Sequence, residues 1–358
     1  MKNTIRLAVL GQYPLFFTKQ FTGPMRVVYN LCKEWEKMEA VELTVLSKFL
    51  NLQIPIIKPW LVPFRVRLKR FDVLNTHGVS ETAVKATKLC KEQGIPTIYT
   101  AHGAAFKENQ LGYKYSKEFI KSERKLVSLS DKIVSVSPII RNLLMREYEL
   151  PEDKFKVIYN GINPSWRFKG FQKINIRKRY KIPDNRKIIL NVGGTRTVKD
   201  IYFLITALEL LKRKDWHLVL VGKKGDIHKE VMEKCNSKIP GHYNFAGRVS
   251  EHELLNFYQQ SDLLVVASKY EPFGLSPLEA MSCGTPAAVR STAGISHLLE
   301  ENIFETPQEL KDIITRYLDI NKEIDFQRFK KILYRNSWNK RAYDYLELFR
   351  ELTCVRSD

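Results

Sequence analysis

Apolar residues along this chain follow two patterns that alternate from one end to the other. Short, nearly continuous runs of Val, Ile and Leu are typical of strands buried on both faces of a parallel sheet. Between them, apolar residues recur every three or four positions, as in amphipathic helices. The short runs predict strands at 5–10, 41–47, 73–76, 97–100 and 132–136, and again at 188–192, 217–221, 243–246, 263–267 and 285–289.

The alternation of strands and helices predicts the architecture. Helical patterns lie near 24–38, 80–93, 116–129, 138–147 and 337–352, with others between the later strands. Such βαβ repetition is typical of parallel sheets covered by helices on both faces. Glycines and prolines interrupt the pattern near 162–185, where we place a domain boundary. The sequence therefore predicts the α/β fold class, with two doubly wound, Rossmann-like domains.

The composition indicates how many domains the chain can form and in which cellular compartment the protein occurs. The chain has 358 residues, 44% of them hydrophobic, which is enough for two domain cores. Its cysteines, at positions 32, 90, 235, 283 and 354, form no Cys-x-x-Cys or His/Cys cluster, which argues against a disulfide framework or a zinc site. The first apolar run is too short for a signal peptide, and none approaches the roughly 20 residues that span a bilayer. We expect a cytoplasmic protein.

The most informative stretch is 271–286, which places two carboxylates, Glu271 and Glu279, eight positions apart. Ser276 and Pro277 suit the N-cap and the first position of a helix, so we expect a helix to begin there. The N–H groups of its first turn would attract an anion. Because a buried strand precedes this loop, we expect the loop at the edge where open α/β sheets bind ligands.

The spacing alone leaves two interpretations of these glutamates. In a capping box, Glu279 would bind the backbone N–H of Ser276, and Glu271 would be an ordinary solvated carboxylate. Alternatively, the carboxylates would bind sugar or ribose hydroxyls, and the N–H groups of Gly274 and Leu275 would bind a phosphate. A nucleotide-sugar needs both kinds of contact at once.

The wider pattern resembles the retaining glycosyltransferases of family 4, which have the two-domain GT-B fold. Their signature is a Glu, seven residues, a second Glu and then Ala-Met-x-x-Gly-x-Pro. The matching residues here are Glu271, Glu279, Ala280, Met281, Gly284 and Pro286. Segments 100–103, 133–137, 157–162 and 245–249 also resemble strands and turns of the family, so the resemblance covers nearly the whole chain.

The resemblance implies two Rossmann-like domains that face each other across a cleft. Residues 1–165 would form the acceptor-side domain, and the C-terminal helix in residues 337–358 would cross back and pack on it. Residues 166–336 would form the domain that binds the nucleotide-sugar.

The resemblance also implies roles for residues of the second domain. Glu279 would bind the ribose hydroxyls, and Glu271 would face the transferred sugar. The backbone N–H groups of Gly274 and Leu275 would bind the diphosphate, and Arg248 would lie beside the base or the phosphate.

Two cations are candidates for the phosphate contact. The chain contains no Asp-x-Asp, the usual metal-binding motif of nucleotide-sugar enzymes, so protein cations would have to stabilise the leaving diphosphate. Segment 191–200 supplies Arg196 and Lys199 after a strand and two glycines. Lys199 matches the family lysine, whereas Arg196 comes two residues after the usual arginine position, which is Gly194 here. We therefore expect no metal and no other cofactor.

First-domain candidates rest on the same resemblance. His102, in Thr-Ala-His-Gly, matches the histidine that approaches the donor sugar, and His77 at another strand end ranks lower. Gly23 matches the glycine loop at the first helix, although Pro24 stands where the family often has a second glycine. Asn160 matches a hinge position and is interpreted as structural.

Charge is the second informative feature. The formal net charge is +20, with 28 − 15 = +13 from residues 1–170 and 31 − 24 = +7 from residues 171–358. Stretches 60–70 and 113–125 combine Lys and Arg with Trp, Tyr or Phe, which suits an anionic membrane surface. A solvated basic face explains them equally well. The first interpretation implies peripheral contact with the inner face of the cytoplasmic membrane.

These observations predict a retaining, metal-independent glycosyltransferase that moves a sugar from a nucleoside-diphosphate sugar to a hydroxyl of a glycan or lipid-linked acceptor. A sugar-nucleotide epimerase of the same fold is the alternative, and it would need no acceptor. A nucleic-acid-binding protein would explain the charge, but no such motif is recognisable, so we expect no nucleic-acid partner. A dinucleotide-dependent oxidoreductase is disfavoured because no G-x-G-x-x-G follows the first strand.

Overall fold

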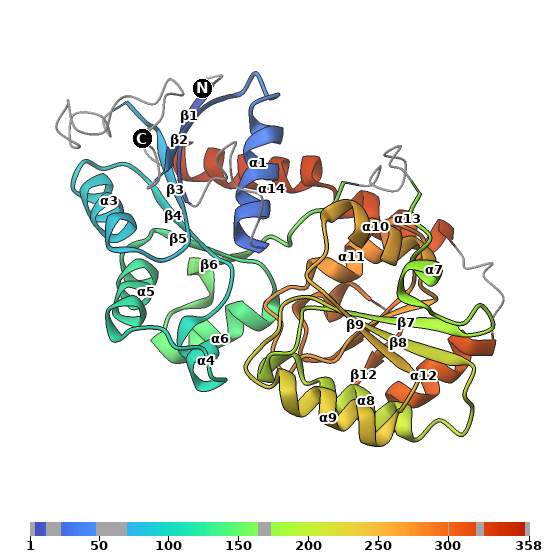
Figure 1. The fold of residues 1–358 in the computed structure, drawn as a ribbon. Helices are drawn as coiled ribbons and strands as arrows, with labels where there is room; N and C mark the ends of the chain where they lie inside the picture. The colour runs from blue at the N-terminus through green and yellow to red at the C-terminus, as the bar shows by residue number, and fades with distance from the viewer. Residues whose placement is uncertain are drawn as a thin grey trace. The chain divides into compact units, whose positions relative to one another are not determined.

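The computed structural model describes residues 4–11, 23–47, 70–163, 173–299, 301–319 and 326–354. The chain divides into two compact units (Figure 1), Met1–Gly161 with Trp338–Asp358, and Ile162–Ser337. The divisions predicted from the sequence lie at 165/166 and 336/337. Within the described residues each unit holds one six-stranded parallel sheet, which confirms the predicted α/β class with two doubly wound domains.

Unit 1 has the strand order β2-β1-β3-β4-β5-β6. Its strands are β1 (Ile5–Gly11), β2 (Val41–Ser47), β3 (Val73–His77), β4 (Thr97–Ala101), β5 (Lys132–Ser135) and β6 (Phe155–Val157). Its helices are α1 (Gly23–Trp35), α3 (Glu81–Glu92), α4 (Ala105–Gln110), α5 (Lys117–Leu129), α6 (Pro138–Tyr148), the 3-10 turn η1 (Glu152–Lys154) and α14 (Trp338–Cys354). The chain adds β2 on one side of β1 and β3 on the other, so the winding reverses between β1 and β3.

The last helix, α14, returns to unit 1 and packs against α1 and β3. The indole N–H of Trp35 donates to the carbonyl oxygen of Ala342 at 3.2 Å. The Trp35 ring also contacts Tyr345 and Phe349, with ring centroids 5.6 and 5.7 Å apart. The apolar face of the predicted C-terminal helix is therefore part of the core of unit 1.

Unit 2 has the strand order β12-β11-β10-β7-β8-β9. Its strands are β7 (Lys187–Val192), β8 (Trp216–Val221), β9 (Tyr243–Gly247), β10 (Leu263–Val266), β11 (Ala287–Arg290) and β12 (Ile303–Phe304). Its helices are α7 (Ile176–Tyr180), η3 (Thr197–Lys199), α8 (Ile201–Glu209), α9 (His228–Lys238), α10 (Glu251–Gln260), α11 (Leu275–Ser282), η4 (Gly294–Leu298), α12 (Pro307–Asp319) and α13 (Phe326–Arg335).

Helices cover both faces of the second sheet (Figure 1). α8 packs against α9 and α12 on one face, and α11 packs against α10 and α13 on the other. Strand side chains such as Leu218, Leu220 and Val265 are buried against α8, where Leu204 and Leu208 are also buried. This layered burial is why the strands read as continuous apolar runs in the sequence.

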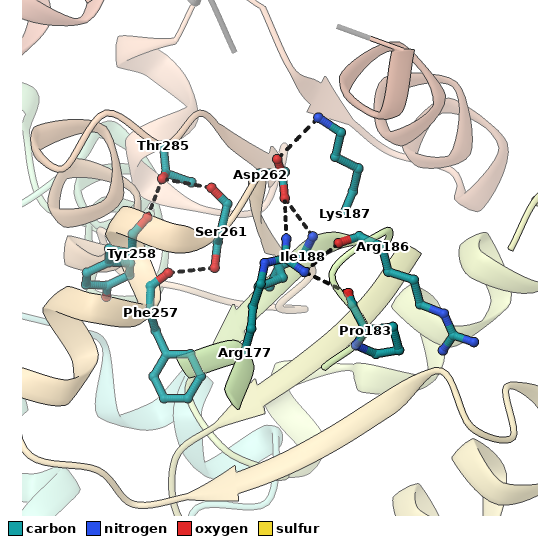
Figure 2. Close-up of polar contacts among 10 residues, drawn as sticks. All are labelled: Arg177, Pro183, Arg186, Lys187, Ile188, Phe257, Tyr258, Ser261, Asp262 and Thr285. Carbon is teal, nitrogen blue, oxygen red and sulfur yellow. Dashed lines mark hydrogen bonds and ion pairs between the residues drawn. The ribbon is translucent and has the colours of Figure 1, made fainter. Parts of the chain in front are cut away.

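A buried aspartate joins the first residues of β7 and β10 (Figure 2). The Asp262 N–H donates to the Ile188 carbonyl oxygen at 2.8 Å, and the Asp262 carboxylate accepts the Ile188 N–H at 2.7 Å. Lys187 and Arg177 place cations 3.5 and 3.9 Å from the same carboxylate. These contacts secure the pairing of the two strands at their amino ends, and their carboxyl ends point to the opposite edge.

Two aspartates of unit 1 make the same pair of hydrogen bonds to a neighbouring strand. Asp72, directly before β3, donates its N–H to the Arg6 carbonyl oxygen and accepts the Arg6 N–H, both at 2.9 Å. Asp131, directly before β5, makes the same two bonds with Thr97, at 3.0 and 2.8 Å. An aspartate that precedes a strand therefore sets the register with its neighbour in both sheets.

One predicted strand begins later than expected. The Thr285 hydroxyl donates to the carbonyl oxygens of Tyr258 and, at 3.2 Å, Ser261 (Figure 2), and the Thr285 N–H donates to Ala280 at 2.9 Å. Because these bonds tie Thr285 to neighbouring helices, β11 starts at Ala287 rather than at position 285.

Candidate active site

The strand order of unit 2 identifies a ligand-binding edge. From β7 the chain moves to β8 and β9 on one side, and later to β10, β11 and β12 on the other. The winding therefore reverses between β7 and β10, and open α/β sheets bind ligands at the carboxyl ends of such strands. The loops that follow these two strands are 193–200 and 267–274.

The conformation of the loop after β7 requires glycine, because another stretch of backbone packs directly against it. Gly194 has φ +76°, and a Cβ placed there would lie 2.2 Å from the Lys223 carbonyl oxygen. A Cβ on Gly222, in the loop after β8, would lie 2.3 Å from the Gly194 nitrogen. The two backbones therefore touch, and no side chain fits at position 194. An arginine could therefore not stand at position 194 on this backbone.

Lys199 and Glu271 meet at this edge. Lys199 ends η3, and its Nζ lies 2.5 Å from the Glu271 Oε2, with both side chains 20% exposed. A backbone bond from the Lys269 N–H to the Val198 carbonyl oxygen, 2.9 Å long, joins the two loops beside this ion pair. A Cβ on Gly193 would lie 2.9 Å from the Lys199 Cε, so the glycine leaves room for the lysine stem. The structure thus brings together the expected phosphate cation and the expected sugar carboxylate.

The Glu271 backbone is held by the segment after β11. Glu271 forms a parallel bridge with Ala293, and its carbonyl oxygen accepts the Gly294 N–H at 2.9 Å. The Thr292 hydroxyl donates to the Ser268 carbonyl oxygen at 2.7 Å. Tertiary contacts, rather than the local sequence, therefore orient this glutamate.

The helix after Glu271 begins two residues earlier than expected, at Leu275 rather than at Pro277. α11 starts at Leu275 with Gly274 as N-cap at φ +94°, and no side-chain hydrogen bond caps it among the described residues. The predicted N-cap, Ser276, and the capping box with Glu279 are therefore wrong. The positive φ of Gly274 turns the chain into the helix, so that Ser276 lies within the first turn.

Glu279 lies on the inner side of α11 and is 5% exposed. The Tyr258 hydroxyl, from α10, donates to the Glu279 Oε2 at 2.8 Å. This hydrogen bond fixes the position of the buried carboxylate between α11 and α10. Tyr258 could not be predicted as a site residue, because no local pattern distinguishes it from other apolar-face residues of α10.

Two further predicted cations lie at other points of this edge. Arg196 is exposed and precedes η3, and the Thr197 N–H and hydroxyl both donate to Asp226, at 2.9 and 2.6 Å. Arg248 is exposed and follows β9, so β8 separates its strand from β7. Arg196 thus shares the loop of Lys199, whereas Arg248 lies two strands away.

In unit 1 the structure pairs two histidines, His77 and His102, that were predicted as separate candidates. His77 ends β3, His102 follows β4, and these strands are neighbours. His77 Nδ1 and His102 Nε2 lie 3.1 Å apart, and the rings stack with centroids 5.3 Å apart. The signal in the sequence was the repeated His-Gly after consecutive strands, at 77–78 and 102–103.

The loop after His102 is also anchored. The buried Glu123 carboxylate accepts the Ala105 N–H at the start of α4 at 2.8 Å, and it accepts the Tyr148 hydroxyl at 2.9 Å. Burial raises the pKa of Glu123, and these hydrogen bonds oppose that effect. Gly23 begins α1 and is exposed, while the rest of its expected loop, residues 12–22, lies outside the described residues.

Within the described residues no group of three or more His, Cys, Asp or Glu side chains is arranged to hold a metal ion. Two doubly wound α/β units, the second with a cation and a carboxylate paired where its winding reverses, agree with the GT-B fold class. The family model described as "Glycosyl transferases group 1" matches residues 172–334, and "Glycosyltransferase Family 4" matches residues 30–166. The chain belongs to this family of glycosyltransferases.

Individual relatives agree with this assignment. An uncharacterized glycosyltransferase of Methanocaldococcus jannaschii is 36% identical over 65% of this chain, and the aligned part spans 61% of that protein. The O-antigen biosynthesis glycosyltransferase WclY of Escherichia coli is 25% identical over 94% of this chain and 98% of its own length. Anabaena HepE, solved in complex with UDP and glucose, superposes with a TM-score of 0.67 at 16% identity, over 97% of this chain and 100% of that chain.

Proposed function

We propose that this protein transfers a sugar from a nucleoside-diphosphate sugar to a hydroxyl of a glycan or lipid-linked acceptor. The observation that carries the proposal is the ion pair of Lys199 with Glu271 at the carboxyl ends of β7 and β10. A donor bound there would place its diphosphate against the cation and its sugar against the carboxylate.

The chemistry requires stabilisation of the charge that grows on the leaving diphosphate. Lys199, Arg196 and the N–H groups of Leu275 and Gly274 would supply it. In the structure Glu271 neutralises Lys199. In the proposed complex the diphosphate replaces Glu271 as the partner of Lys199, and Glu271 binds a sugar hydroxyl.

The remaining residues would orient the donor. Glu279, held by Tyr258, would bind the ribose hydroxyls. His102 and Gly23 of unit 1 would approach the sugar, and Arg248 the base or phosphate. We propose retention of configuration, with the leaving phosphate taking the proton of the acceptor hydroxyl on the same face, because no separate base is then needed.

A thermal-shift panel of UDP, GDP, ADP and their sugars tests donor binding. UDP is the first nucleotide to test, since it occupies a protein of similar fold. A selective rise in Tm that disappears in Glu279→Ala supports the proposal. If no nucleotide shifts the Tm of the wild type, donor binding and the proposal fail together.

Metal independence and stereochemistry need separate measurements. Turnover in EDTA should equal turnover with added Mg²⁺ or Mn²⁺, because the cations Lys199 and Arg196 would carry the phosphate charge. NMR of the first product formed should show the anomeric configuration of the donor. Loss of activity in EDTA, or an inverted product, would refute the corresponding part of the proposal.

We also propose that the acceptor is presented at an anionic membrane surface. On the exterior of unit 1, Tyr115 stacks between Tyr113 and Phe119 with centroid distances of 5.9 and 4.5 Å. The adjoining basic residues are exposed: Lys114, Lys117, Lys121, Arg124 and Lys125. Basic heads around aromatic rings suit a lipid headgroup layer. Residues 60–69 of the other basic stretch lie outside the described residues, and no described helix is long and apolar enough to cross a membrane.

Co-sedimentation with vesicles of anionic or neutral lipid tests this surface. Lys121→Glu with Arg124→Glu should reduce binding to anionic vesicles, whereas Lys85→Glu with Lys88→Glu, on the exposed side of α3, should have a smaller effect. Equal loss in both double variants would mean that total charge, rather than this face, attracts the membrane. No binding in low salt would end the proposal.

A further inference from the structure

The contact between His77 and His102 in unit 1 indicates which nitrogen of each ring is protonated. Burial lowers the pKa of His77 well below its usual value, and the charge of His102 lowers it further. Burial lowers the pKa of His102 to about 4. Each ring is therefore neutral at neutral pH and carries a single N–H. In the contact between His77 Nδ1 and His102 Nε2, one nitrogen must donate and the other must accept.

The two possible tautomer pairs differ at the far nitrogen of His77. His77 Nε2 is buried and has no hydrogen-bond partner among the described residues. If Nδ1 accepted, the proton of His77 would lie on Nε2, as a buried donor without an acceptor. Buried N–H donors without an acceptor are rarer in proteins than buried acceptors without a donor. If Nδ1 donates, Nε2 carries only a lone pair.

The position of His77 is fixed from several sides. A Cβ on Gly11, at the end of β1, would lie 3.1 Å from the His77 Cβ, so the strands approach closely there. The Tyr345 ring of α14 lies 6.3 Å from the His77 ring, and its hydroxyl is 3.4 Å from the Thr100 hydroxyl. The imidazole therefore has little freedom to seek another partner.

We propose that His77 is a positioning residue that donates its Nδ1–H to His102 Nε2 and thereby holds the His102 proton on Nδ1. The consequence rests on the proposed function, in which His102 meets the donor sugar. His102 would then offer the sugar or phosphate oxygen a neutral N–H donor. Since its lone pair accepts from His77, His102 would not act as the general base for the acceptor hydroxyl.

Nitrogen NMR of the wild-type protein tests the pairing without any ligand. Long-range proton–nitrogen correlations of histidine-labelled protein report which ring nitrogen is protonated in each of the 7 histidines. The signals of His77 and His102 are assigned from the variants in which each is replaced. We expect Nδ1 to be protonated in both rings. A proton on Nε2 of His102 overturns the proposal.

Two matched variants test the direction of the hydrogen bond. His77→Asn keeps an N–H donor near the Nδ1 position, whereas His77→Asp offers only an acceptor. The Asn variant should keep the His102 proton on Nδ1, and the Asp variant should move it to Nε2. Identical His102 spectra in the two variants, with unchanged thermal melts, would contradict the proposal.

Turnover connects the pairing to the reaction. With the UDP- or GDP-sugar that stabilises the wild type, kcat should stay within about threefold in His77→Asn and fall about tenfold or more in His77→Asp. Equal kcat in both variants would show that the hydrogen bond between His77 and His102 does not affect catalysis. That result would overturn the proposed role of His77 in positioning the His102 proton for the reaction. If the spectra are as expected but the wild type neither binds nor turns over any of the nucleotide-sugars, the proposed function fails while the histidine pairing stands.

Discussion

Replacing Lys199 by methionine removes one charge of the ion pair with Glu271 and keeps most of the side-chain volume. The two charged atoms lie 2.5 Å apart, and each side chain is 20% exposed. The pair is therefore intermediate between exposed pairs, worth about 0–1 kcal/mol, and buried pairs, whose disruption costs about 3–5 kcal/mol. We expect Lys199→Met to lower the free energy of unfolding by about 1–3 kcal/mol.

The effect on turnover should be larger than the effect on stability. If Lys199 stabilises the leaving diphosphate, its loss should resemble the loss of one oxyanion-hole donor, about 10²–10³ in kcat. Release of the nucleoside diphosphate measures turnover, and urea unfolding measures stability. Lys199→Met, Glu271→Gln and the double variant form a cycle that isolates the coupling between the two side chains. Lys229→Met, at an 87% exposed position on α9, is the matched control.

Two outcomes would refute this reasoning. Wild-type turnover in Lys199→Met, together with the expected loss of stability, would show that the ion pair is only structural. A coupling energy near zero in the stability cycle would show that the two charges do not stabilise each other, whatever their separation.

Three further predictions follow from the structure. Gly194→Ala should lower the free energy of unfolding by more than Gly241→Ala, which should cost about 1–2 kcal/mol, because both have positive φ but only position 194 lacks space for a Cβ; equal urea midpoints would contradict this. Glu279→Ala should lower turnover at least about tenfold, and Tyr258→Phe should weaken nucleotide binding by less than Glu279→Ala does, since the tyrosine hydroxyl only orients the carboxylate. Calorimetry measures nucleotide binding and release of the nucleoside diphosphate measures turnover. Weaker nucleotide binding in Tyr258→Phe than in Glu279→Ala would contradict these roles. Because the pKa of His102 falls from 6.5 to about 4 on folding, the unfolded state binds more protons in this range, and stability should decline as pH drops from 6.5 toward 4. That decline, at most about 3 kcal/mol from this group, should be smaller in His102→Asn, and parallel pH curves for the two proteins would exclude the effect.

Much of the fold could be predicted from local patterns. The longer strands of both sheets occur where continuous apolar runs predict them, because burial on both faces demands such runs. The short strands β6 and β12 went unpredicted, since Phe155–Val157 and Ile303–Phe304 are too brief to show a period. The start of α11 was misplaced because Gly274, rather than the better N-cap Ser276, supplies the conformation that turns the chain.

The candidate site residues also divide into those that the sequence could predict and those that it could not. Glu271 and Glu279 were named from a signature and its spacing, and Lys199 from its match to the family lysine; the structure places Lys199 against Glu271. Tyr258 could not be named, because its partner Glu279 lies on a different helix and only their packing joins them.

The sequence by itself determined which segments become strands and helices, that they form two doubly wound units, and which residue types stand at the strand ends. These properties depend on residues close together in the chain. Only the tertiary structure decided that Lys199 pairs with Glu271, 72 positions away, and that His77 pairs with His102, 25 positions away. Such contacts depend on which strands lie side by side and on where glycines let two backbones touch. Local propensities determine neither of these features.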